Sequence, residues 1–290
     1  MPIIRGKHIA DKMCIAIKAR TQAFVQQYGK HPTLALIRVG NDPASIIYVR
    51  NKVQRAQEIG ICSQVFELPA DMSSSELGTR IKTLNANSDV HGILVQLPLP
   101  ASLDTETIID TISPQKDVDG LTTITQGNLF RGTSCLKPCT AQGIVTLLKT
   151  VHSDLSGKHA VILGRSLIVG RSVGLMLLHE DCTITLVHSR SHDIAALCKR
   201  ADIVVAAVGK PHFVTRSFIK EGATVIDVGI SRVLCASGTS KIVGDVDFND
   251  VSSVAGFITP VPGGVGPMTV GCLMQNTIEA AENQMKAHHT

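Results

Sequence analysis

Apolar residues along this chain gather into short runs separated by amphipathic stretches. In the first half, three runs predict β-strands and three stretches with helical periodicity predict helices. The strands are expected at 33–39, 63–68 and 92–97, and the helices near 7–28, 43–59 and 74–86. Alternation of strand and helix is typical of βαβ units, so this half predicts an α/β domain with a parallel sheet.

A stretch at 113–139, rich in Gly and Pro, predicts loops and a domain boundary. Beyond it, continuous apolar runs predict a second set of buried parallel strands. The strands are expected at 159–164, 183–188, 202–208 and 223–228, with helices near 170–179, 191–200 and 215–221 and a closing helix at 267–285. We therefore expect two domains, 1–139 with 267–290 and a Rossmann-like domain at 140–266, with the closing helix packed on the first domain.

Composition narrows the class of protein. The 290 residues are 44% hydrophobic and only 18% charged, which excludes a disordered chain. The absence of Trp, with only two Tyr, argues against a base-stacking nucleic-acid surface, and no apolar run is long enough to span a membrane. The eight cysteines lack zinc-site spacing, so we expect no metal site and free thiols in a reducing, cytoplasmic compartment.

A glycine-rich turn follows the first strand of the second half, over Gly164–Gly174. Such a turn exposes backbone N–H groups that can bind a pyrophosphate, although the spacing is not G-x-G-x-x-G and an ordinary βα turn remains an alternative. The next strand ends at Ser189 and Arg190, where NAD-specific folds carry an acid. Hydroxyls and an Arg suit a 2′-phosphate, which favours NADP unless Arg190 is simply a solvated charge.

The helix expected near 43–59 carries a second set of candidates. One stripe is expected to face the core; it consists of Ile46, Val49, Val53 and Ala56. Ser45, Tyr48 and Lys52 fall on an adjacent stripe, so that Tyr48 and Lys52 project together. A Tyr/Lys pair at this spacing is usually a helix surface, and both interpretations stay open on spacing alone.

Three further segments are candidates for a ligand site. Gln96 ends a parallel strand, where ligands commonly bind, and Asp119 follows in the loop-rich stretch. The residues 260–269, with three Pro and three Gly among small apolar residues, suit a rigid backbone wall against a flat ligand. Taken singly, these features are better explained by an edge hydrogen bond at Gln96, an Asx turn at Asp119 and a buried turn at 260–269.

Together, these motifs resemble the methylenetetrahydrofolate dehydrogenase/methenyltetrahydrofolate cyclohydrolase family. The resemblance covers both halves in order: Y-x-x-x-K at Tyr48, Q-L-P-L-P at Gln96, D-V-D-G at Asp117, G-R-S-x-I-V-G-R at Gly164, and the segment 262–270. The chain departs from the family pattern at Thr125, Ala141 and Ser172, where the family usually has Asn, Pro and Pro.

The resemblance implies oxidation of 5,10-methylenetetrahydrofolate with NADP+ and hydrolysis of the methenyl product to 10-formyltetrahydrofolate. By this resemblance, the catalytic residues would be Lys52, Tyr48, Gln96 and Asp119. The folate would be contacted by Tyr48, Asp119, Pro260, Val261, Pro262, Gly263 and Gly264. The NADP contacts would be Gly164, Arg165, Ser166, Val169, Gly170, Ser189, Arg190, Ala207, Gly209 and Ile230. The resemblance further implies a folate site between the domains, a folate partner with or without a polyglutamate tail, a homodimer formed through the second domain, and cis peptide bonds at Leu97-Pro98 and Val261-Pro262.

Two other classes remain compatible with parts of the pattern. A shikimate-dehydrogenase-like enzyme also joins a Lys-bearing first domain to an NADP-binding second domain, but it needs neither D-V-D-G nor the Pro/Gly wall. A non-catalytic NADP-binding regulator would be expected to have lost Lys52 or Gln96, and both are present. A short-chain dehydrogenase is disfavoured because its Tyr-x-x-x-Lys follows the Rossmann glycines, whereas Tyr48 and Lys52 precede them.

Overall fold

The computed structural model describes residues 2–234 and 239–287. They divide into a first unit, Asp11–Cys139 with Val270–Thr290, and a second unit, Met1–Ala10 with Thr140–Thr269. The chain passes from one unit to the other inside α1 (Gly6–Tyr28), at the start of α6 (Cys139–Lys149) and inside α10 (Val265–Ala287).

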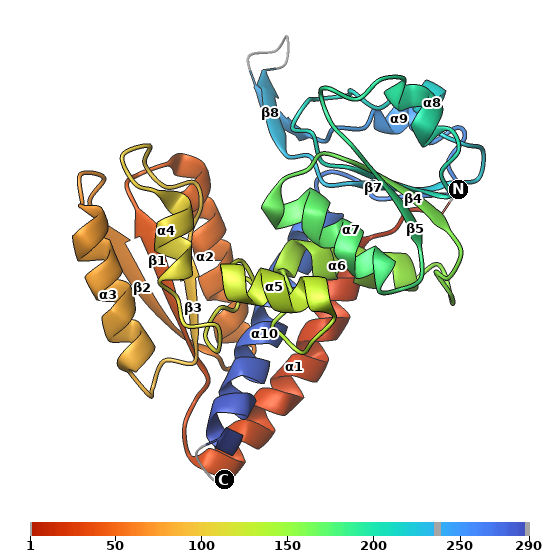
Figure 1. The fold of residues 1–290 in the computed structure, drawn as a ribbon. Coiled ribbons are helices and arrows are strands. Elements are labelled where there is room, and N and C mark those ends of the chain that lie inside the picture. Colours follow the sequence, from red (N-terminus) through yellow and green to blue (C-terminus); the bar gives the residue numbers. More distant parts are fainter. Residues whose placement is uncertain (1, 235–238, 288–290) are drawn as a thin grey trace. The chain divides into compact units, whose positions relative to one another are not determined.

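The first unit is built on a three-stranded parallel sheet in the order β2-β1-β3 (Figure 1). Its strands are β1 (Thr33–Val39), β2 (Cys62–Leu68) and β3 (Gly92–Val95). The central strand β1 is buried on both faces, as expected for a parallel sheet. Its side chains alternate: Leu34 and Leu36 join one core cluster, whereas Ala35, Ile37 and Val39 join another.

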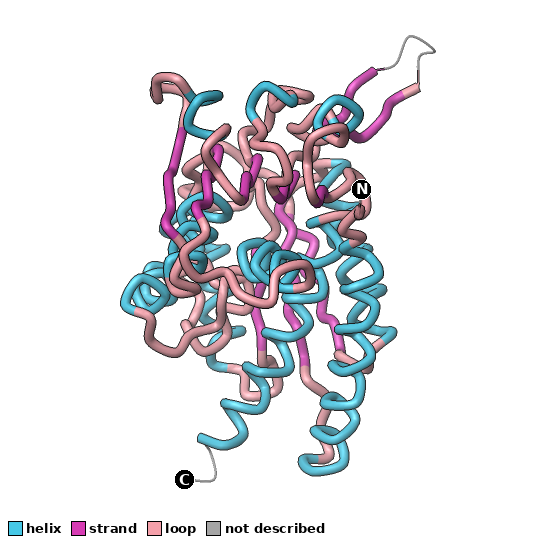
Figure 2. Tube along the Cα trace, turned by 90° about the vertical axis from the view of Figure 1, so that its right-hand side faces the viewer, coloured by secondary structure: helices cyan, strands magenta, loops and turns pink. Residues whose placement is uncertain are grey.

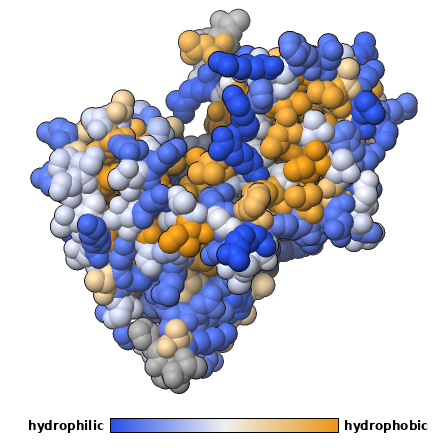
Figure 3. Space-filling model, viewed as in Figure 1, coloured by the Kyte–Doolittle hydropathy of each residue, from blue (hydrophilic) through white to orange (hydrophobic). Residues whose placement is uncertain are grey.

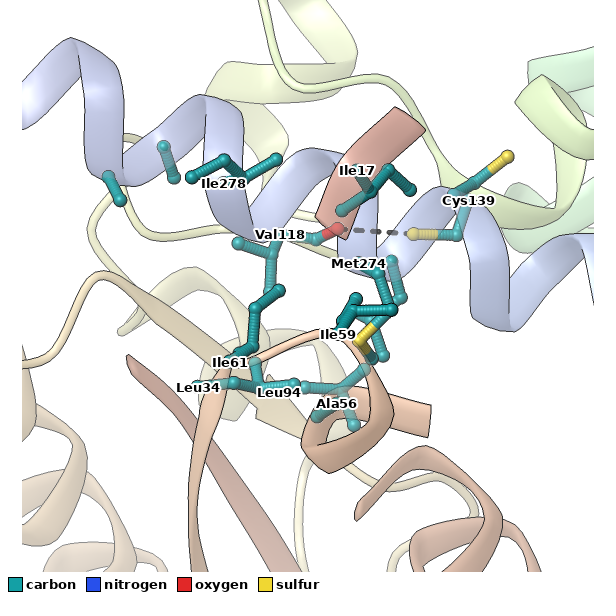
Figure 4. Packing of buried hydrophobic residues seen from close by; sticks show 14 of the residues in the cluster. Ile17, Leu34, Ala56, Ile59, Ile61, Leu94, Val118, Cys139, Met274 and Ile278 are labelled. Carbon is teal, nitrogen blue, oxygen red and sulfur yellow. Dashed lines mark hydrogen bonds between the residues drawn. The ribbon is translucent and has the colours of Figure 1, made fainter. Parts of the chain in front are cut away.

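Helices cover both faces of this sheet. On one face, α3 (Ser74–Ala86) buries Leu77, Ile81 and Leu84, and a capping box between Ser73 and Glu76 fixes its start. On the other, α1, α2 (Pro43–Glu58) and α10 share a cluster that includes Ile17, Ala56 and Ile278 (Figure 4). Arg20 and Glu282 also join α1 to α10 by a bidentate ion pair, with a shorter distance of 2.7 Å. The prediction that the C-terminal helix packs on the first domain is confirmed.

The stretch at 113–139 is less irregular than its composition suggested. It contains α5 (Thr123–Arg131), which Thr122 caps at its start and Gly132 ends in a left-handed conformation with φ 69°. Thr residues and an internal Gly127 lower the intrinsic helix propensity, which explains why the sequence pattern predicted loops here. The short helix α4 (Thr105–Asp110) precedes this stretch.

The second unit contains a five-stranded parallel sheet in the order β10-β7-β6-β4-β5. Its strands are β4 (His159–Leu163), β5 (Thr183–Val187), β6 (Ile203–Ala206), β7 (Thr224–Asp227) and β10 (Phe257–Ile258). The strand order reverses at β4, which has β5 on one side and β6 on the other. The carboxyl ends of β4 and β6 therefore flank a topological switch point, the usual ligand position in such sheets.

Several helical predictions in this unit were wrong in extent or kind. The helix expected near 170–179 is a π-helical turn, η1 (Leu167–Arg171), followed by α7 (Ser172–Leu178). The helix expected near 191–200 is only α8 (Ile194–Cys198), and the one expected near 215–221 is a 3-10 turn, η2 (Arg216–Phe218). These short elements contain few hydrogen bonds of their own. They are stabilised instead by Leu197, Phe218 and neighbouring apolar residues, which pack on the core.

Besides α4, α5, α6 and β10, three further short elements were not predicted from the sequence. They are β8 (Ser231–Leu234), β9 (Ser240–Val243) and α9 (Phe248–Val251). Strands β8 and β9 pair antiparallel and stand away from the five-stranded sheet (Figure 2). Their exposed, short sequences lack the long apolar runs that reveal buried strands.

Residues 2–10 group with the second unit rather than with the first, where the sequence pattern placed them. The Ile4 N–H donates to the carbonyl of Ile258 at 2.8 Å, and the Lys7 N–H donates to that of Gly263 at 3.0 Å. These contacts join segments about 250 residues apart, which local periodicity cannot reveal. Among the described residues, no helix combines the length and the apolar composition needed to cross a bilayer.

Candidate active site

Helix α2 positions Lys52. The Asp42 carboxylate accepts the Ser45 N–H at 2.7 Å and Pro43 occupies the first turn, so the predicted helix start is correct. The predicted core stripe was partly wrong, since Ile46 is 42% exposed. The buried residues of α2 are instead Ser45, Val49, Lys52 and Ala56. Lys52 thus lies within the buried stripe itself, which is unusual for an amine.

Lys52 and Gln96 form one hydrogen-bonded unit. The Lys52 Nζ donates to the Gln96 Oε1 at 2.9 Å, and both side chains are 9% exposed. Gln96 follows β3 directly and is fixed by two further bonds: its N–H donates to the Ile37 carbonyl and its Nε2 to the Leu97 carbonyl. Burial lowers the pKa of Lys52, although the charge of Asp119 opposes this shift. The neutral amine is therefore more accessible than in a solvated lysine.

The two acids of the D-V-D-G segment have different roles. Both Asp117 carboxylate oxygens accept backbone N–H groups, from Gly120 and Leu121 on Oδ1 and from Thr122 on Oδ2. Asp117 therefore shapes the loop and the start of α5. Asp119 is partly exposed; burial raises its pKa, and the Lys52 charge opposes that shift. Asp119 is thus the carboxylate left near Lys52 for a ligand.

Cys139 belongs to the same cluster, although the sequence pattern indicated only a packed thiol. Its Sγ donates to the Val118 carbonyl at 3.1 Å, as the dashed line in Figure 4 marks. Burial and the Asp119 carboxylate hold the pKa of the Cys139 thiol well above its ordinary value. The thiol is therefore a proton donor rather than a nucleophile. No spacing in the sequence links Cys139 to Lys52, so only the fold reveals this neighbour.

Tyr48 lies one turn before Lys52 on α2 and remains 37% exposed. Partial burial raises the pKa of its phenol. A protonated, amphipathic ring next to a buried amine can stack on a flat ligand and donate a hydrogen bond from its hydroxyl.

The glycine-rich turn of the second unit is tightly packed. Gly164 has φ 111°, and a Cβ there would lie 2.2 Å from the Ala207 carbonyl oxygen. A Cβ at Gly170 would lie equally close to the Gly164 carbonyl oxygen. The Ser166 Oγ accepts the Val169 N–H at 3.3 Å and caps the π-helical turn. The loop between β4 and α7 therefore requires small residues at the switch point of the sheet.

A cavity of about 290 Å³ lies at this switch point. Four of the expected NADP residues line it: Gly164, Arg165, Ser189 and Ala207. The other six expected NADP residues, Ser166, Val169, Gly170, Arg190, Gly209 and Ile230, are not among its lining residues. Sequence reasoning missed Lys210 and Phe213 in the lining; the Lys210 Nζ lies 5.6 Å from the centre of the Phe213 ring.

The chemistry of this cavity fits a dinucleotide. Leu163, Val187 and Ile194 supply apolar walls for a base, and Arg165 and Lys210 supply positive charge for phosphate. No acid lies among the lining residues, whereas an acid would be expected for a ribose 2′-hydroxyl. The residues present therefore fit NADP.

The Pro/Gly segment also belongs to the second unit. The peptide bonds Leu97-Pro98 and Val261-Pro262 are cis, which confirms both predictions. Pro260 and Val261 line a separate cavity of about 200 Å³. Gly263 and Gly264 instead meet the N-terminal segment, where a Cβ at Gly6 would lie 1.9 Å from the Gly264 carbonyl oxygen. This close approach explains the glycine at position 6.

The fold defines an α/β enzyme with a Rossmann-like dinucleotide-binding unit and a separate unit that carries a buried lysine. Comparisons with known proteins identify its family. Residues 4–119 match the tetrahydrofolate dehydrogenase/cyclohydrolase catalytic domain, and residues 138–285 match the NAD(P)-binding domain of the same family. The chain belongs to the tetrahydrofolate dehydrogenase/cyclohydrolase family, as the sequence motifs predicted.

Individual relatives agree along the whole chain. The bifunctional protein FolD of Bradyrhizobium sp. (strain BTAi1) is 51% identical over 279 residues, covering 96% of this chain and 95% of the relative. The crystal structure of the bifunctional enzyme FolD from Campylobacter jejuni is 43% identical with a TM-score of 0.94, covering 98% and 99% of the two chains. The Trypanosoma brucei enzyme, solved with NADP cofactor and an inhibitor, is 37% identical with a TM-score of 0.94, covering 99% and 100%.

Proposed function

We propose that this protein oxidises 5,10-methylenetetrahydrofolate to 5,10-methenyltetrahydrofolate with NADP+ and hydrolyses the product to 10-formyltetrahydrofolate. The observation that carries the proposal is the buried Lys52–Gln96 pair beside Asp119, in a chain that matches both domains of the family. Family membership and the retained Lys52 and Gln96 also disfavour the shikimate-dehydrogenase-like and non-catalytic alternatives.

The first unit, with the C-terminal helix, is proposed to hold the folate, and the second unit to hold NADP. NADP+, when bound, supplies the hydride acceptor. Arg165, Ser189 and Lys210 would contact the 2′-phosphate on its adenosine. The turn at Gly164, which has no side chain, would let the backbone N–H groups approach the pyrophosphate. Hydride transfer needs aligned reactants rather than a protein base, so positioning is the contribution of these residues to the oxidation.

The hydrolysis requires a proton carrier. Water adds to the methenyl carbon, the carbon–N5 bond then breaks, and one proton is released for each 10-formyl product. Lys52 is proposed to take and return the proton at its Nζ, since burial favours its neutral form and Gln96 fixes its position. Asp119 would accept N–H groups of the pterin, Tyr48 would pack on its ring, and the backbone of Pro260–Gly264 would provide a further contact surface.

Cofactor choice provides the test. Arg165, Ser189 and Lys210 predict a preference for NADP+, because one charged contact to a phosphate contributes on the order of 1.5–3 kcal/mol. Absorbance-monitored turnover of 5,10-methylenetetrahydrofolate should give kcat/KM at least about ten-fold higher with NADP+ than with NAD+. Ser189→Asp should reduce this ratio, and Ser253→Asp, at an exposed position of the second unit that does not line the cavity, serves as the control. Equal efficiency with both cofactors would contradict the assignment.

Assembly and location complete the proposal. A homodimer through the second unit is supported by apolar side chains on the exposed side of α7 and the edge strand β5, where Leu178 is 49% and Leu186 is 38% exposed. Figure 3 shows apolar atoms gathered over this part of the second unit. The free thiols of the described cysteines suit a cytoplasmic enzyme, and the net charge of +4 suits folates with polyglutamate tails.

A further inference from the structure

One carboxylate holds the loop that follows β6 in the second unit. The Asp245 Oδ2 accepts two successive backbone N–H groups, from Val208 at 2.6 Å and from Gly209 at 2.9 Å. Asp245 follows β9 and is completely buried. Val208 and its neighbour Ala207 line the proposed dinucleotide cavity, whereas Asp245 does not. Asp245 therefore holds the backbone of the cavity wall without facing the cavity itself.

A second carboxylate holds Asp245 in turn. The Asp227 Oδ1 accepts the Asp245 N–H at 2.9 Å and the Gly229 N–H at 3.0 Å, and its Oδ2 accepts the Val246 N–H at 3.0 Å. Asp227 ends β7, and its own N–H donates to the Thr259 Oγ1 at 2.8 Å. A chain of hydrogen bonds therefore runs from β7 through Asp245 to the backbone at 208–209.

The surrounding glycines permit this close packing. A Cβ at Gly244 would lie 1.8 Å from the Asp227 Oδ2, and a Cβ at Gly229 would lie 2.4 Å from the Asp245 Cγ. Side chains at either position would separate the two acids from the backbone groups that they bind. Segments from three parts of the chain thus meet around one pair of carboxylates.

The arrangement is costly as a purely structural brace. The Asp245 Oδ1 is buried and has no hydrogen-bond partner, so half of the carboxylate is desolvated without compensation. A neutral side chain could satisfy the same two N–H groups at lower cost. A carboxylate, however, accepts two N–H groups on one oxygen more strongly and fixes their directions more narrowly.

We propose that Asp245 is a positioning residue for NADP: its carboxylate sets the backbone of Val208 and Gly209 at the wall of the dinucleotide cavity, and Asp227 holds Asp245 in place. The inference rests on the proposed NADP site. It assigns to these acids an effect on cofactor affinity rather than a part in the reaction, since neither lies among the residues that line the cavity.

The test compares two neighbouring acids. Asp245→Asn keeps the shape of the side chain but removes its charge. Asp247→Asn makes the same change two residues later, where the side chain caps α9 by accepting the Asp250 N–H and contacts no part of the 207–209 loop in the hydrogen-bond network. NADPH fluorescence is a suitable readout of affinity, because the chain contains no Trp. Asp245→Asn should raise the Kd for NADPH about ten-fold or more, and Asp247→Asn should change it by less than about two-fold.

Two further readouts separate positioning from simple loss of structure. Hydrolysis of 5,10-methenyltetrahydrofolate, which needs no NADP, should stay within about two-fold of wild type in Asp245→Asn. Asp227→Asn should weaken NADPH binding less, and the two substitutions should be non-additive because Asp227 acts through Asp245. An unchanged Kd in folded Asp245→Asn, or equal losses of binding and hydrolysis, would overturn the inference.

Amide hydrogen exchange of the wild-type protein tests the inference without any substitution. The N–H groups of Val208 and Gly209 should be protected in the absence of NADP, although Gly209 itself is exposed. Rapid exchange of both amides would overturn the inference even if Asp245→Asn fails to fold. A wild-type protein that does not bind NADPH would instead refute the proposed function.

Discussion

At the scale of single residues, Lys52, Gln96, Asp119 and Cys139 form one cluster in which burial favours uncharged forms. Burial lowers the pKa of Lys52 and raises that of Asp119, while each charge opposes the shift of the other. Because burial lowers its pKa, Lys52 reaches its neutral form more easily than a solvated lysine does, which favours proton exchange with a bound ligand. We therefore propose that the cluster serves hydrolysis rather than hydride transfer.

Lys52→Met tests this division of roles. It keeps most of the bulk of the stem and removes the amine, so hydrolysis of 5,10-methenyltetrahydrofolate should fall by at least about 10²-fold. The oxidation step should retain more of its rate, and NADP affinity should stay near wild type because the glycine-rich turn is untouched. Removing Gln96 should resemble Lys52→Met and should be non-additive with it.

The control is Lys82→Met, at an exposed position of α3 in the same unit. It should change neither half-reaction. Hydrolysis at the wild-type rate in Lys52→Met, measured separately from oxidation, would show that Lys52 serves only the packing of α2.

At the scale of elements, the second unit leaves one sheet edge and one helix with apolar, exposed side chains. Strand β5 pairs only with β4 in the five-stranded sheet, and α7 exposes Leu178 near the end of its short span. Edge strands with apolar flanks are favourable surfaces for pairing with a second copy. Helix α7 directly follows the π-helical turn η1, which belongs to the glycine-rich turn at the dinucleotide cavity. The exposed apolar surface at Leu178 and the dinucleotide site are therefore adjacent along the chain.

We expect sedimentation equilibrium to give about 62 kDa, twice the 30.9 kDa mass of one chain. The double substitution Leu178→Lys and Leu186→Lys places two charges on each copy of the proposed interface. It should raise the dissociation constant of the dimer by at least about ten-fold, so that more of the protein is monomeric. Ile15→Lys, at a 72% exposed position of α1, is the control and should leave the mass unchanged. A wild-type monomer at micromolar concentration would refute the dimer.

At the scale of the whole molecule, His91 predicts how stability depends on pH. Its side chain is 1% exposed, its Nδ1 accepts the Thr33 N–H at 3.1 Å, and its ring meets Phe24 edge-on. Burial, with the charges of Lys116 and Lys30, lowers its pKa from 6.5 to about 4, although Asp89 opposes the shift. The folded protein therefore keeps His91 neutral at pH values where the unfolded chain already protonates it.

The sign of the effect follows from proton binding. Between pH 6.5 and 4 the unfolded state binds more protons at this site, so the stabilising contribution of neutral His91 is complete above pH 6.5 and is lost as the pH falls toward 4. The free energy of unfolding should decrease by about 3 kcal/mol from this residue alone. Asp227, whose pKa burial raises to about 6, gives a slope of opposite sign.

Comparison of wild type with His91→Phe isolates the histidine. Urea unfolding measures the free energy of unfolding at pH 7 and at pH 4 for each protein. The decrease from pH 7 to pH 4 should be about 2–3 kcal/mol smaller in His91→Phe than in wild type. A change in stability that the substitution causes equally at both pH values does not affect this comparison. Parallel pH profiles for the two proteins would contradict the role assigned to His91.

The sequence by itself determined the two α/β halves, the parallel strands and the family. Buried parallel strands appear in the sequence as continuous apolar runs. Short motifs such as those at Tyr48, Gln96 and Gly164 can be recognised from a few consecutive residues, without knowledge of contacts in space. Elements with weak local signals were missed or misjudged: α5 is low in helix propensity, η2 depends on the core beneath it, and the exposed β8–β9 pair lacks an apolar run.

Only the tertiary structure decided which side chains share an environment. Periodicity placed Lys52 beside the buried stripe of α2, whereas packing against β3 and the D-V-D-G loop places it inside that stripe. The same holds for Cys139 near Asp119 and for Asp245 behind Val208, which are separated by 20 and 37 residues. Hydrogen bonding and desolvation depend on distances in space, and a linear pattern carries no information on contacts between residues so far apart along the chain.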